Sequence, residues 1–562
     1  MTFVADELLG YAGNGIGTTT TFVSLALARR GHDVTVLFAG PPRNGPVTAV
    51  WQSLYEDSGV LVRELAPGDG NVEPRHFARA RDVEAALRVD PPDVVVVQDL
   101  GAPAYTALRL RRLGLAFERT SFVVFCHGTR QWVTDVSRKI RVLPGAHAVT
   151  VLERASVELA DAVVSPSAYL VDWMRDEGWR LPMQTFVIPH VSRAAATGER
   201  RPAPVEPAER VERIAFFGRL EERKGVGPFV EAVNSLDADV DVEFLGRPTP
   251  LWPVERIREL LRHEHVAFET GLDQHEALER LRRPGTLAVI PSFEENSPNV
   301  IYECLENGVP FIASDVAGIR ELVAADDRAR VLFEPTPDGI AAALRRALAN
   351  GGALRPARAA FDDEDSLRRW EHVLALPAHP PPPAGAGVLE PGWVVLRDDG
   401  DVDGPELVET LVRAQEVSGA DVVTCGVSVN GTTTHLFPGE PGALGLLTNG
   451  YGTVALVRSA LVEGREGEAR WPLLAQLSLE GAKIVSVPLP LATTTTAPAT
   501  LQTQPVQALR VLASFERALP ERLSFLAELV TRTAAAEPVA SQAPRRSFVR
   551  RVLARLARTL RR

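Results

Sequence analysis

Two glutamates eight positions apart, Glu295 and Glu303, flank a Ser-Pro-Asn step in the stretch PSFEENSPNVIYECLENGVPFIAS. The apolar run LAVI before this stretch is typical of a buried strand. Pro298 suits the first turn of a helix, because a proline lacks the N–H that would have no intrahelical partner there, and Ser297 is a natural cap before it. The pattern predicts a helix that leaves the carboxyl end of a strand and ends at Gly308.

A helix in that place would begin at the crevice where ligands bind in open parallel sheets. Its first N–H groups, those of Asn299 and Val300, would point into the crevice with the positive end of the helix dipole and would bind phosphate. Glu303 lies five residues past Pro298, roughly 7.5 Å along the helix axis, and Glu295 lies in the loop on the other side. A ligand with a central diphosphate and a sugar at each end would therefore meet one carboxylate per sugar.

For an isolated pair of acids, a simpler explanation is the better one. Acidic side chains near a helix start complement the helix dipole, which stabilises a helix by about 0.3 to 1 kcal/mol without any ligand. Only the surrounding residues can decide between this explanation and a ligand site.

The order of strands and helices around these acids indicates parallel sheets built from β-α-β units. In the first half, buried strands are expected at 32–40, 93–100, 121–128 and 161–167, with helices between them. The segment 191–210, rich in Pro, Ala and charge, is typical of a linker, and a second alternating series follows it. The predicted fold class is α/β, with two Rossmann-like domains that face a cleft, at 1–190 and 211–376, the second closed by a helix at 362–376.

Beyond residue 376 the chain changes character. Residues 377–392 are predicted to form a stiff Pro-rich linker, and 393–492 a smaller α/β unit. Residues 493–562 are expected to hold flexible segments and helices, ending in a basic amphipathic helix at 545–562 with eight arginines and no acid. That helix fits an anionic membrane surface. A solvated tail, or a helix that docks on an acidic protein surface, fits the pattern equally well.

Composition excludes several classes of protein. With 562 residues and a formal net charge of −11, the chain is too long for one core and too acidic for general nucleic-acid binding. It shows no signal-peptide pattern and no apolar run near the roughly 20 residues that span a bilayer, so a cytoplasmic location is expected. Cys126, Cys304 and Cys425 lie far apart in apolar runs, which is typical of reduced core thiols, and no structural metal is expected.

The acidic pair, its spacing and the downstream GVPFIAS and AGIREL resemble glycosyltransferase family 4, the retaining GT-B sugar transferases. FFGRLEERKG is similar to the loop by which that family brings an Arg and a Lys to the donor diphosphate, which gives Arg219 and Lys224. Lys224 is one of only three lysines among 61 basic residues, and a compact ammonium acts as a point charge on phosphate. GNGIGTTTT is similar to the family's glycine loop and gives Gly15 and Gly17, and FVVFCHGTRQW places His127 at a strand end.

The resemblance implies a retaining hexosyltransferase that needs no metal and no cofactor. The donor would be a nucleotide-diphosphate sugar held mainly by the second domain, and a glycan or lipid-linked acceptor would bind the first. Glu303 would accept hydrogen bonds from ribose hydroxyls, and Glu295 from hydroxyls of the transferred sugar. Arg219, Lys224 and the helix start would stabilise the departing diphosphate, and His127 would position the sugar. Cell-surface polysaccharide or glycoconjugate biosynthesis, at the inner face of the membrane, fits such an enzyme.

The resemblance to family 4 ends near residue 376. The stretch WVVLRDDGDVDGPEL resembles the second half of a GT-A sugar transferase domain, whose strand ends in an acidic metal-binding cluster. The first half of that domain has no counterpart in this chain, and Arg470 stands where the GT-A family usually has an acid. Residues 393–492 are therefore expected to be a degenerate, noncatalytic unit in which Asp399 and Asp401 could still bind a cation.

Two other functions compete with sugar transfer. The first is a noncatalytic nucleotide-binding or sugar-binding scaffold; the intact set of Arg219, Lys224, Glu295 and Glu303 speaks against it, and an absence of nucleotide binding would favour it. The second is a glycosidase, which would use two carboxylates about 5 to 9.5 Å apart and no nucleotide donor. A screen of nucleotide-sugar donors separates these possibilities.

Overall fold

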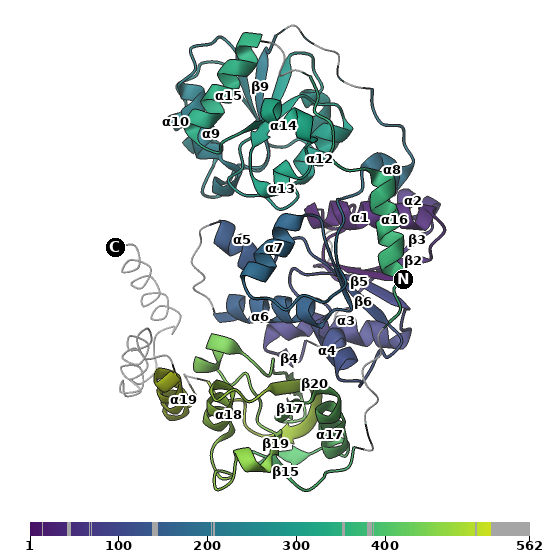
Figure 1. Cartoon of the computed structure of the whole chain (residues 1–562), viewed down its shortest axis with the longest axis vertical. Coiled ribbons are helices and arrows are strands. Elements are labelled where there is room, and N and C mark those ends of the chain that lie inside the picture. The colour runs from purple at the N-terminus through teal and green to yellow at the C-terminus, as the bar shows by residue number, and fades with distance from the viewer. Residues whose placement is uncertain are drawn as a thin grey trace.

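The structure is a computed structural model that describes residues 1–518, apart from 14, 42–46, 67, 69, 138–143, 204, 206, 207, 209, 351–354, 379–384, 386, 501 and 502. Three α/β parts are stacked along the long axis of the molecule (Figure 1): the second Rossmann-like domain, then the first, then the C-terminal part. The predicted α/β class with two Rossmann-like domains is confirmed.

The first domain is built on a parallel sheet in the order β3-β2-β1-β5-β6-β7-β8. Runs such as VVVVQ form strands without polar alternation, because helices cover both faces of a parallel sheet. The strands are β1 (Thr2–Ala5), β2 (Val34–Phe38), β3 (Val60–Glu64), β5 (Val94–Gln98), β6 (Ser121–Phe125), β7 (Ala162–Ser165) and β8 (Thr185–Val187). The helices are α1 (Gly15–Arg29), α2 (Ala49–Ser58), α3 (Ala78–Val89), α4 (Tyr105–Arg112), α5 (Arg130–Val136), α6 (Pro144–Leu159), α7 (Ala168–Asp176) and α8 (Arg193–Thr197). The strand order reverses at β1, so a crevice opens at the carboxyl ends of β1 and β5.

The second domain repeats this plan with the parallel order β11-β10-β9-β12-β13-β14. Its strands are β9 (Arg213–Phe217), β10 (Asp241–Leu245), β11 (Val266–Glu269), β12 (Thr286–Ile290), β13 (Phe311–Ser314) and β14 (Leu332–Phe333). Its helices are the short 3₁₀ helix η2 (Glu222–Lys224), α9 (Val226–Asn234), α10 (Val254–Leu260), α11 (Gln274–Leu281), α12 (Asn299–Glu306), α13 (Ala317–Arg320), α14 (Ala325–Val331) and α15 (Pro337–Asn350).

The helix that follows the second domain in sequence packs on the first. This helix, α16 (Asp363–Leu374), buries Leu367 and Trp370 in the core that contains β1, β2 and β6. The ring of Trp370 lies 4.9 Å from that of Phe125, centroid to centroid. The chain therefore crosses between the two domains twice, once before β9 and once before α16, which lies beside α1 (Figure 1).

The C-terminal part is a mixed sheet flanked by helices. Its strands are β15 (Trp393–Leu396), β16 (Val402–Asp403), β17 (Val422–Val429), β18 (Thr433–His435), β19 (Ala455–Arg458) and β20 (Ile484–Thr494), and its helices are α17 (Leu407–Ser418), α18 (Arg470–Leu479) and α19 (Pro505–Ala518). α19 buries Val511 and Leu512 against α18, so this part extends beyond residue 492. The resemblance of this part to a GT-A domain stays a prediction.

A two-residue strand of the first domain, β4 (Val72–Glu73), completes the C-terminal sheet by pairing in parallel with β18. The N–H of Thr434 donates to the carbonyl of Asn71 at 2.7 Å, and the N–H of Leu436 donates to that of Glu73 at 2.8 Å. Leu110 of α4 is buried in one core with residues of α17. The C-terminal part is thus joined to the side of the first domain that lies away from the second domain (Figure 1).

Two predicted segments lie outside the described residues: the basic helix at 545–562, and residues 379–384 and 386 of the Pro-rich linker. Among the helices that the structure does describe, none is long and apolar enough to cross a membrane. The three cysteines, Cys126, Cys304 and Cys425, are buried and unpaired.

Candidate functional site

The helix predicted after the acidic loop is α12, which follows β12. It begins one residue later than predicted, because Pro298 is its N-cap with an extended backbone (φ −76°, ψ 124°). The hydroxyl of Ser297 does not cap the helix but bonds with the hydroxyl of Tyr302 at 2.8 Å, so the predicted serine cap is wrong. A proline N-cap has no side-chain acceptor, which leaves the first N–H groups of α12 to other partners.

Glu295 lies in the loop before α12 and is 4% exposed. Its carboxylate forms one ion pair with Lys224 and another with Arg223, whose Nη1 lies 3.1 Å away. Burial by itself would raise the pKa of Glu295, but the charges of Lys224 and Arg223 outweigh it and lower the pKa to about 2. Lys224 and Glu295 are 71 positions apart in sequence. They meet because β9 and β12, which precede their loops, are neighbours in the sheet.

Arg223 is a site residue that the sequence did not single out. Nearly all of the 61 basic residues are arginines, so a single Arg gives no signal except its place directly before Lys224. Arg219, which the resemblance assigned to the diphosphate, has a side chain that is 58% exposed and lies 4.0 Å from the Glu221 carboxylate. Arg223 is therefore held in place, whereas Arg219 can turn toward a ligand.

Glu303 lies one turn into α12 and is half-buried. Its carboxylate accepts a hydrogen bond from Nε2 of Gln274, on α11, at 2.5 Å. Burial raises the pKa of Glu303 to about 7, and the nearby charge of Glu306 adds to the shift, while Gln274 and the charge of Lys224 oppose it. The charge of Lys224 therefore acts on both predicted acids, Glu295 and Glu303.

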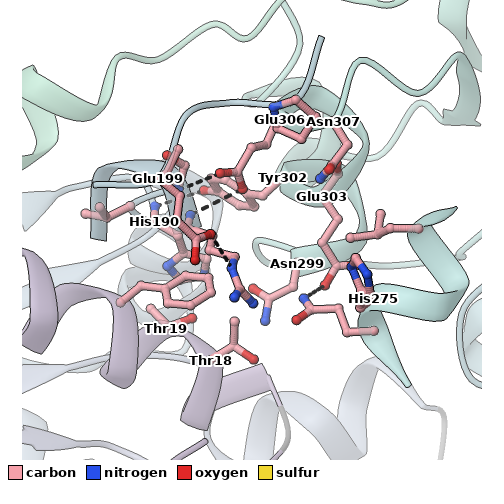
Figure 2. A pocket seen from close by; sticks show the side chains of 18 of the residues that line it. Thr18, Thr19, His190, Glu199, His275, Asn299, Tyr302, Glu303, Glu306 and Asn307 are labelled. Atoms are coloured by element: carbon pink, nitrogen blue, oxygen red, sulfur yellow. Dashed lines mark hydrogen bonds and ion pairs between the residues drawn. The ribbon is translucent and has the colours of Figure 1, made fainter. Parts of the chain in front are cut away.

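A cavity of about 500 Å³ lies between the two domains beside α12. Figure 2 shows Thr18 and Thr19 of α1 on one side of it, Glu303 and His275 on another, and Asn299 between them. Its remaining wall comes from the segment that starts at His190 and leads toward the second domain, and from further residues in and next to α11 and α12. Of the predicted site residues, Asn299 and Glu303 line this cavity, whereas Arg219, Lys224 and Glu295 are not part of its wall.

The predicted glycine loop forms the start of α1. Asn299 reaches across from the second domain, and its Nδ2 donates to the carbonyl oxygen of Gly15 at 3.1 Å. A Cβ at Gly17 would lie 2.9 Å from the backbone nitrogen of Leu8, so close packing within the first domain accounts for this glycine. A role of Gly17 toward the donor stays a prediction. Val300 is partly buried against the core of the second domain. Only its backbone N–H, and not its side chain, is therefore a candidate for binding phosphate.

His127 follows β6 and lies across the boundary between the domains. The centroid of its ring lies 4.2 Å from that of Phe125 and 6.1 Å from that of His190, and both ring pairs are tilted. Burial, with a smaller effect of His190, holds the pKa of His127 well below its usual value, so the ring is neutral. Among the described residues, no group bonds its buried Nε2. A neutral imidazole of this kind can donate or accept a hydrogen bond but cannot act as a positive charge.

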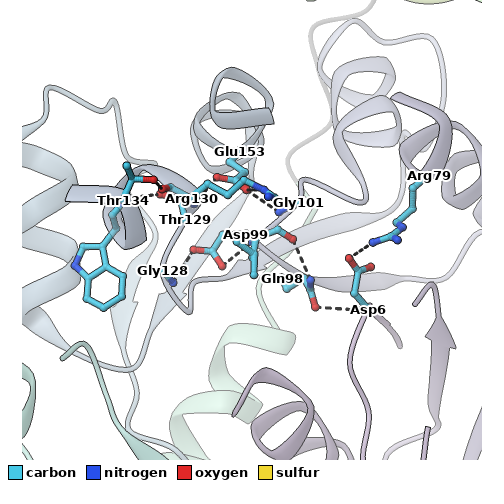
Figure 3. A network of polar contacts seen from close by, with 12 residues as sticks. Asp6, Arg79, Gln98, Asp99, Gly101, Gly128, Thr129, Arg130, Thr134 and Glu153 are labelled. Atoms are coloured by element: carbon cyan, nitrogen blue, oxygen red, sulfur yellow. Dashed lines mark hydrogen bonds and ion pairs between the residues drawn. The ribbon is translucent and has the colours of Figure 1, made fainter. Parts of the chain in front are cut away.

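Two buried carboxylates hold the loop that carries His127 (Figure 3). Asp99 accepts the N–H groups of His127 at 2.9 Å and Gly128 at 3.0 Å. Glu153 accepts those of Gly101 and Arg130, both at 2.8 Å. Burial raises the pKa of Asp99 to about 6 and that of Glu153 to about 7. Two buried acids therefore fix the loops after β5 and β6: Asp99, which belongs to the loop after β5, and Glu153, which lies on α6.

The acidic residues that follow β15, Asp398, Asp399 and Asp401, lie next to a cationic side chain, that of Arg470. Arg470 is 4% exposed, its backbone N–H donates to Asp398 at 3.2 Å, and its Nε lies 3.5 Å from the same carboxylate. Within the described part of the chain, no group of three or more His, Cys, Asp or Glu could hold a metal ion. Asp401 accepts from the N–H of Asp398 at 3.2 Å. Cation binding by Asp399 and Asp401 stays a prediction.

Two glycosyltransferase family models match the chain. The model described as a glycosyl transferase 4-like domain matches residues 14–190, and the model described as glycosyl transferases group 1 matches residues 211–350. Together they span more than half of the chain and correspond to the first and second domains. Neither extends into the C-terminal part.

Known proteins with similar sequences include a glycogen synthase and a glycosyltransferase. A glycogen synthase of Mycobacterium tuberculosis is 27% identical over 396 residues, which are 65% of this chain and 90% of that protein. A D-inositol 3-phosphate glycosyltransferase of Xylanimonas cellulosilytica is 30% identical over 211 residues, 34% of this chain and 47% of that protein. The solved structure of a sucrose-phosphate synthase from Thermosynechococcus elongatus superposes with a TM-score of 0.50 and 19% identity, over 66% of this chain and 96% of that one.

Proposed function

Since the chain is a glycosyltransferase of the GT-B type, we propose that it transfers a hexose from a nucleotide-diphosphate sugar to an acceptor, with retention of the anomeric configuration. The nucleoside would lie in the cavity beside Glu303, and the diphosphate against the start of α12. The observation that carries this proposal is the cavity of about 500 Å³ between the domains, whose wall contains Glu303 and Asn299 at the start of a helix. A carboxylate for ribose hydroxyls and free N–H groups for phosphate are the two features that such a donor requires.

In the proposed reaction, the acceptor hydroxyl oxygen bonds to the anomeric carbon while the bond from that carbon to the diphosphate oxygen breaks. The bonding electron pair leaves with the diphosphate, and the hydroxyl proton passes to the departing phosphate oxygen. Arg219 and the N–H groups at the start of α12 would stabilise the charge that develops there, because preorganised donors in a site closed to water stabilise a transition state strongly. Glu295, which Lys224 and Arg223 hold in place, would accept hydrogen bonds from hydroxyls of the transferred sugar.

His127 would position the transferred sugar by a hydrogen bond and would not act as a base. This assignment follows from its low pKa and its unbonded Nε2. The positive charge that would stabilise the leaving group comes from Arg219 and from the start of α12. The proposed reaction therefore uses no metal and no further cofactor. The acceptor would be a glycan or lipid-linked molecule on the first domain, in cell-surface polysaccharide or glycoconjugate biosynthesis, with residues 545–562 at the inner face of the membrane.

The test is a screen of nucleoside diphosphates and nucleotide sugars by thermal shift, because a ligand that binds the folded state raises the apparent melting temperature. One nucleoside diphosphate should stabilise the protein, and Glu303→Ala should weaken its binding. Lys224→Ala should mainly slow transfer. Glu409→Ala, at an exposed position of α17 in the C-terminal part, is the matched control and should change neither. Wild-type binding and transfer in both site variants would contradict the proposed site.

A noncatalytic scaffold is the second candidate. An assay of nucleoside diphosphate release separates the two functions, because a scaffold would bind the nucleotide or sugar but would not release nucleoside diphosphate from a nucleotide sugar in the presence of any acceptor.

A further inference from the structure

The loop Glu294-Glu295-Asn296 turns successive side chains in opposite directions. Glu295 points into its own domain, toward Lys224 and Arg223. Its two neighbours face the first domain: the Glu294 carboxylate interacts with the hydroxyl of Tyr169 and contributes to raising its pKa, and Asn296 is buried. An extended segment alternates its side chains in this way. Glu294 and Asn296, which flank Glu295, therefore face the first domain.

Asn296 connects the loop Glu294-Glu295-Asn296, which we call the donor loop, to the loop that carries His127. Its Nδ2 donates to the carbonyl oxygen of His127 at 3.1 Å, and its Oδ1 accepts from the hydroxyl of Ser167. The backbone N–H of His127 is held within its own domain, because it donates to Asp99 at 2.9 Å. The backbone of His127 is thus bonded on both sides by buried side chains, one from each domain.

Glu321 provides a second connection at the start of α7. Its carboxylate accepts the N–H of Ala168 at 2.7 Å and the N–H of Tyr169 at 2.8 Å, which are the first two N–H groups of that helix. The third, that of Leu170, donates to the Ser167 hydroxyl at 3.1 Å. A carboxylate at a helix N-terminus is a favourable partner, since it meets both free N–H groups and the positive end of the dipole. Here the carboxylate belongs to the other domain.

The segments that carry Asn296 and Glu321 pack directly on each other. Glu321 follows α13 directly, and Gly318 of α13 lies against the donor loop so closely that a Cβ would come within 1.9 Å of the carbonyl oxygen of Asn296 and within 2.2 Å of that of Glu295. Only a glycine fits at that position. Any shift of Glu321 relative to α7 would therefore be transmitted to the loop that carries Glu295 and Asn296.

We propose that Asn296 and Glu321 are positioning residues that dock the donor loop on the first domain and so set the place of His127 relative to the Glu295–Lys224 pair. This inference rests on the proposed function, because it concerns where His127 and the donor loop stand during transfer. Neither side chain touches the reacting atoms. Both act through the loops that they hold.

The first test measures docking without any substrate. Hydrogen exchange at Ala168 and Tyr169 should be faster in Glu321→Ala by roughly tenfold or more, as expected when hydrogen bonds to a charged group are lost. Glu321→Gln keeps the shape and one acceptor oxygen and should restore part of the protection. Arg320→Ala is the matched control, because Arg320 pairs with Asp315 inside its own domain and should leave exchange at α7 unchanged. Unchanged exchange in Glu321→Ala would overturn the proposed docking.

The second test separates positioning from binding. Asn296→Ala should lower kcat by about a hundredfold while the KM for the donor changes by less than about threefold, because a small misplacement of groups at the reacting centre slows the reaction without weakening the binding of the donor. A wild-type kcat in Asn296→Ala would refute the positioning role while leaving sugar transfer itself intact. If the wild-type chain transfers no sugar from any donor, the proposed function fails, whereas the exchange measurement still tests the docking.

Discussion

Replacing Glu303 by glutamine should remove most of the pH dependence of nucleoside diphosphate binding between pH 6 and 8. The structure places the pKa of this carboxyl at about 7, raised chiefly by burial. Ribose hydroxyls would donate hydrogen bonds to the ionised carboxylate, so binding favours the form that is present above pH 7. A protonated carboxyl keeps one oxygen as an O–H donor and offers a poorer acceptor.

The expected size of the effect follows from this pKa. With a pKa of about 7, roughly one Glu303 in eleven is ionised at pH 6 and roughly ten in eleven at pH 8. The affinity should therefore rise by about tenfold from pH 6 to pH 8, with the steepest change below pH 7, and binding at pH 6 should release close to one proton from this group. In Glu303→Gln this contribution disappears, and binding should be weaker at pH 8.

Isothermal titration calorimetry at pH 6, 7 and 8, in two buffers with different ionisation enthalpies, measures both the affinity and the proton release. The nucleotide's own phosphate also titrates near pH 6, so the quantity of interest is the difference between wild type and Glu303→Gln with the same ligand. Glu279→Gln is the control, because Glu279 lines the same cavity but is exposed. Identical pH profiles in wild type and Glu303→Gln would refute the assignment of Glu303 to the ribose.

Two further predictions concern stability. Glu295→Gln should lower the free energy of unfolding of the second domain by about 3 kcal/mol at pH 7, because it leaves Lys224 buried without its partner. Since the folded pKa of Glu295 is lowered to about 2, the wild-type advantage is fully present above about pH 4.5 and is lost as the pH falls toward 2; urea unfolding at pH 7 and pH 3 measures it, and equal stability at pH 7 contradicts the buried pair. Thr434→Pro removes the N–H that donates to Asn71, so hydrogen exchange should accelerate at 72–73, 433 and 435–436 while nucleotide binding stays the same. Unchanged exchange would show that this pairing does not hold the C-terminal part.

The sequence predicted the elements whose signals are local. Strands β5 and β6 appear as unbroken apolar runs because both faces of a parallel sheet are covered, and the run at 93–100 contains β5 at Val94–Gln98. The closing helix expected at 362–376 is α16 at Asp363–Leu374, which begins at an aspartate N-cap, Asp362. In each case a few neighbouring residues carry enough information to specify the element.

Contacts between distant segments left no such signal. β4 is two residues long and too short for any periodicity, and its partner strand lies more than 350 positions further along the chain. Its pairing depends on the apolar contacts around it, which no local pattern reveals. The same holds for α16, whose buried face was expected to close the second domain but packs Trp370 against Phe125 of the first. A hydrophobic face indicates burial but does not name the surface that buries it.

The ion pairs of the site are also contacts between distant segments, and the sequence did not predict them. The resemblance assigned Lys224 to a phosphate and Glu295 to a sugar, as two separate contacts, but the structure pairs them with each other. With Arg223 and Glu221 included, this cluster has two cations and two carboxylates within 4 Å of their partners, so it has no net charge to offer an anion. The uncompensated positive potential near the start of α12 therefore comes from the helix itself and from Arg219, whose side chain is 58% exposed. We expect Arg219 and the N–H groups of α12 to attract the diphosphate, while the buried cluster, already neutral and rigid, keeps the loop that carries Glu295 in place.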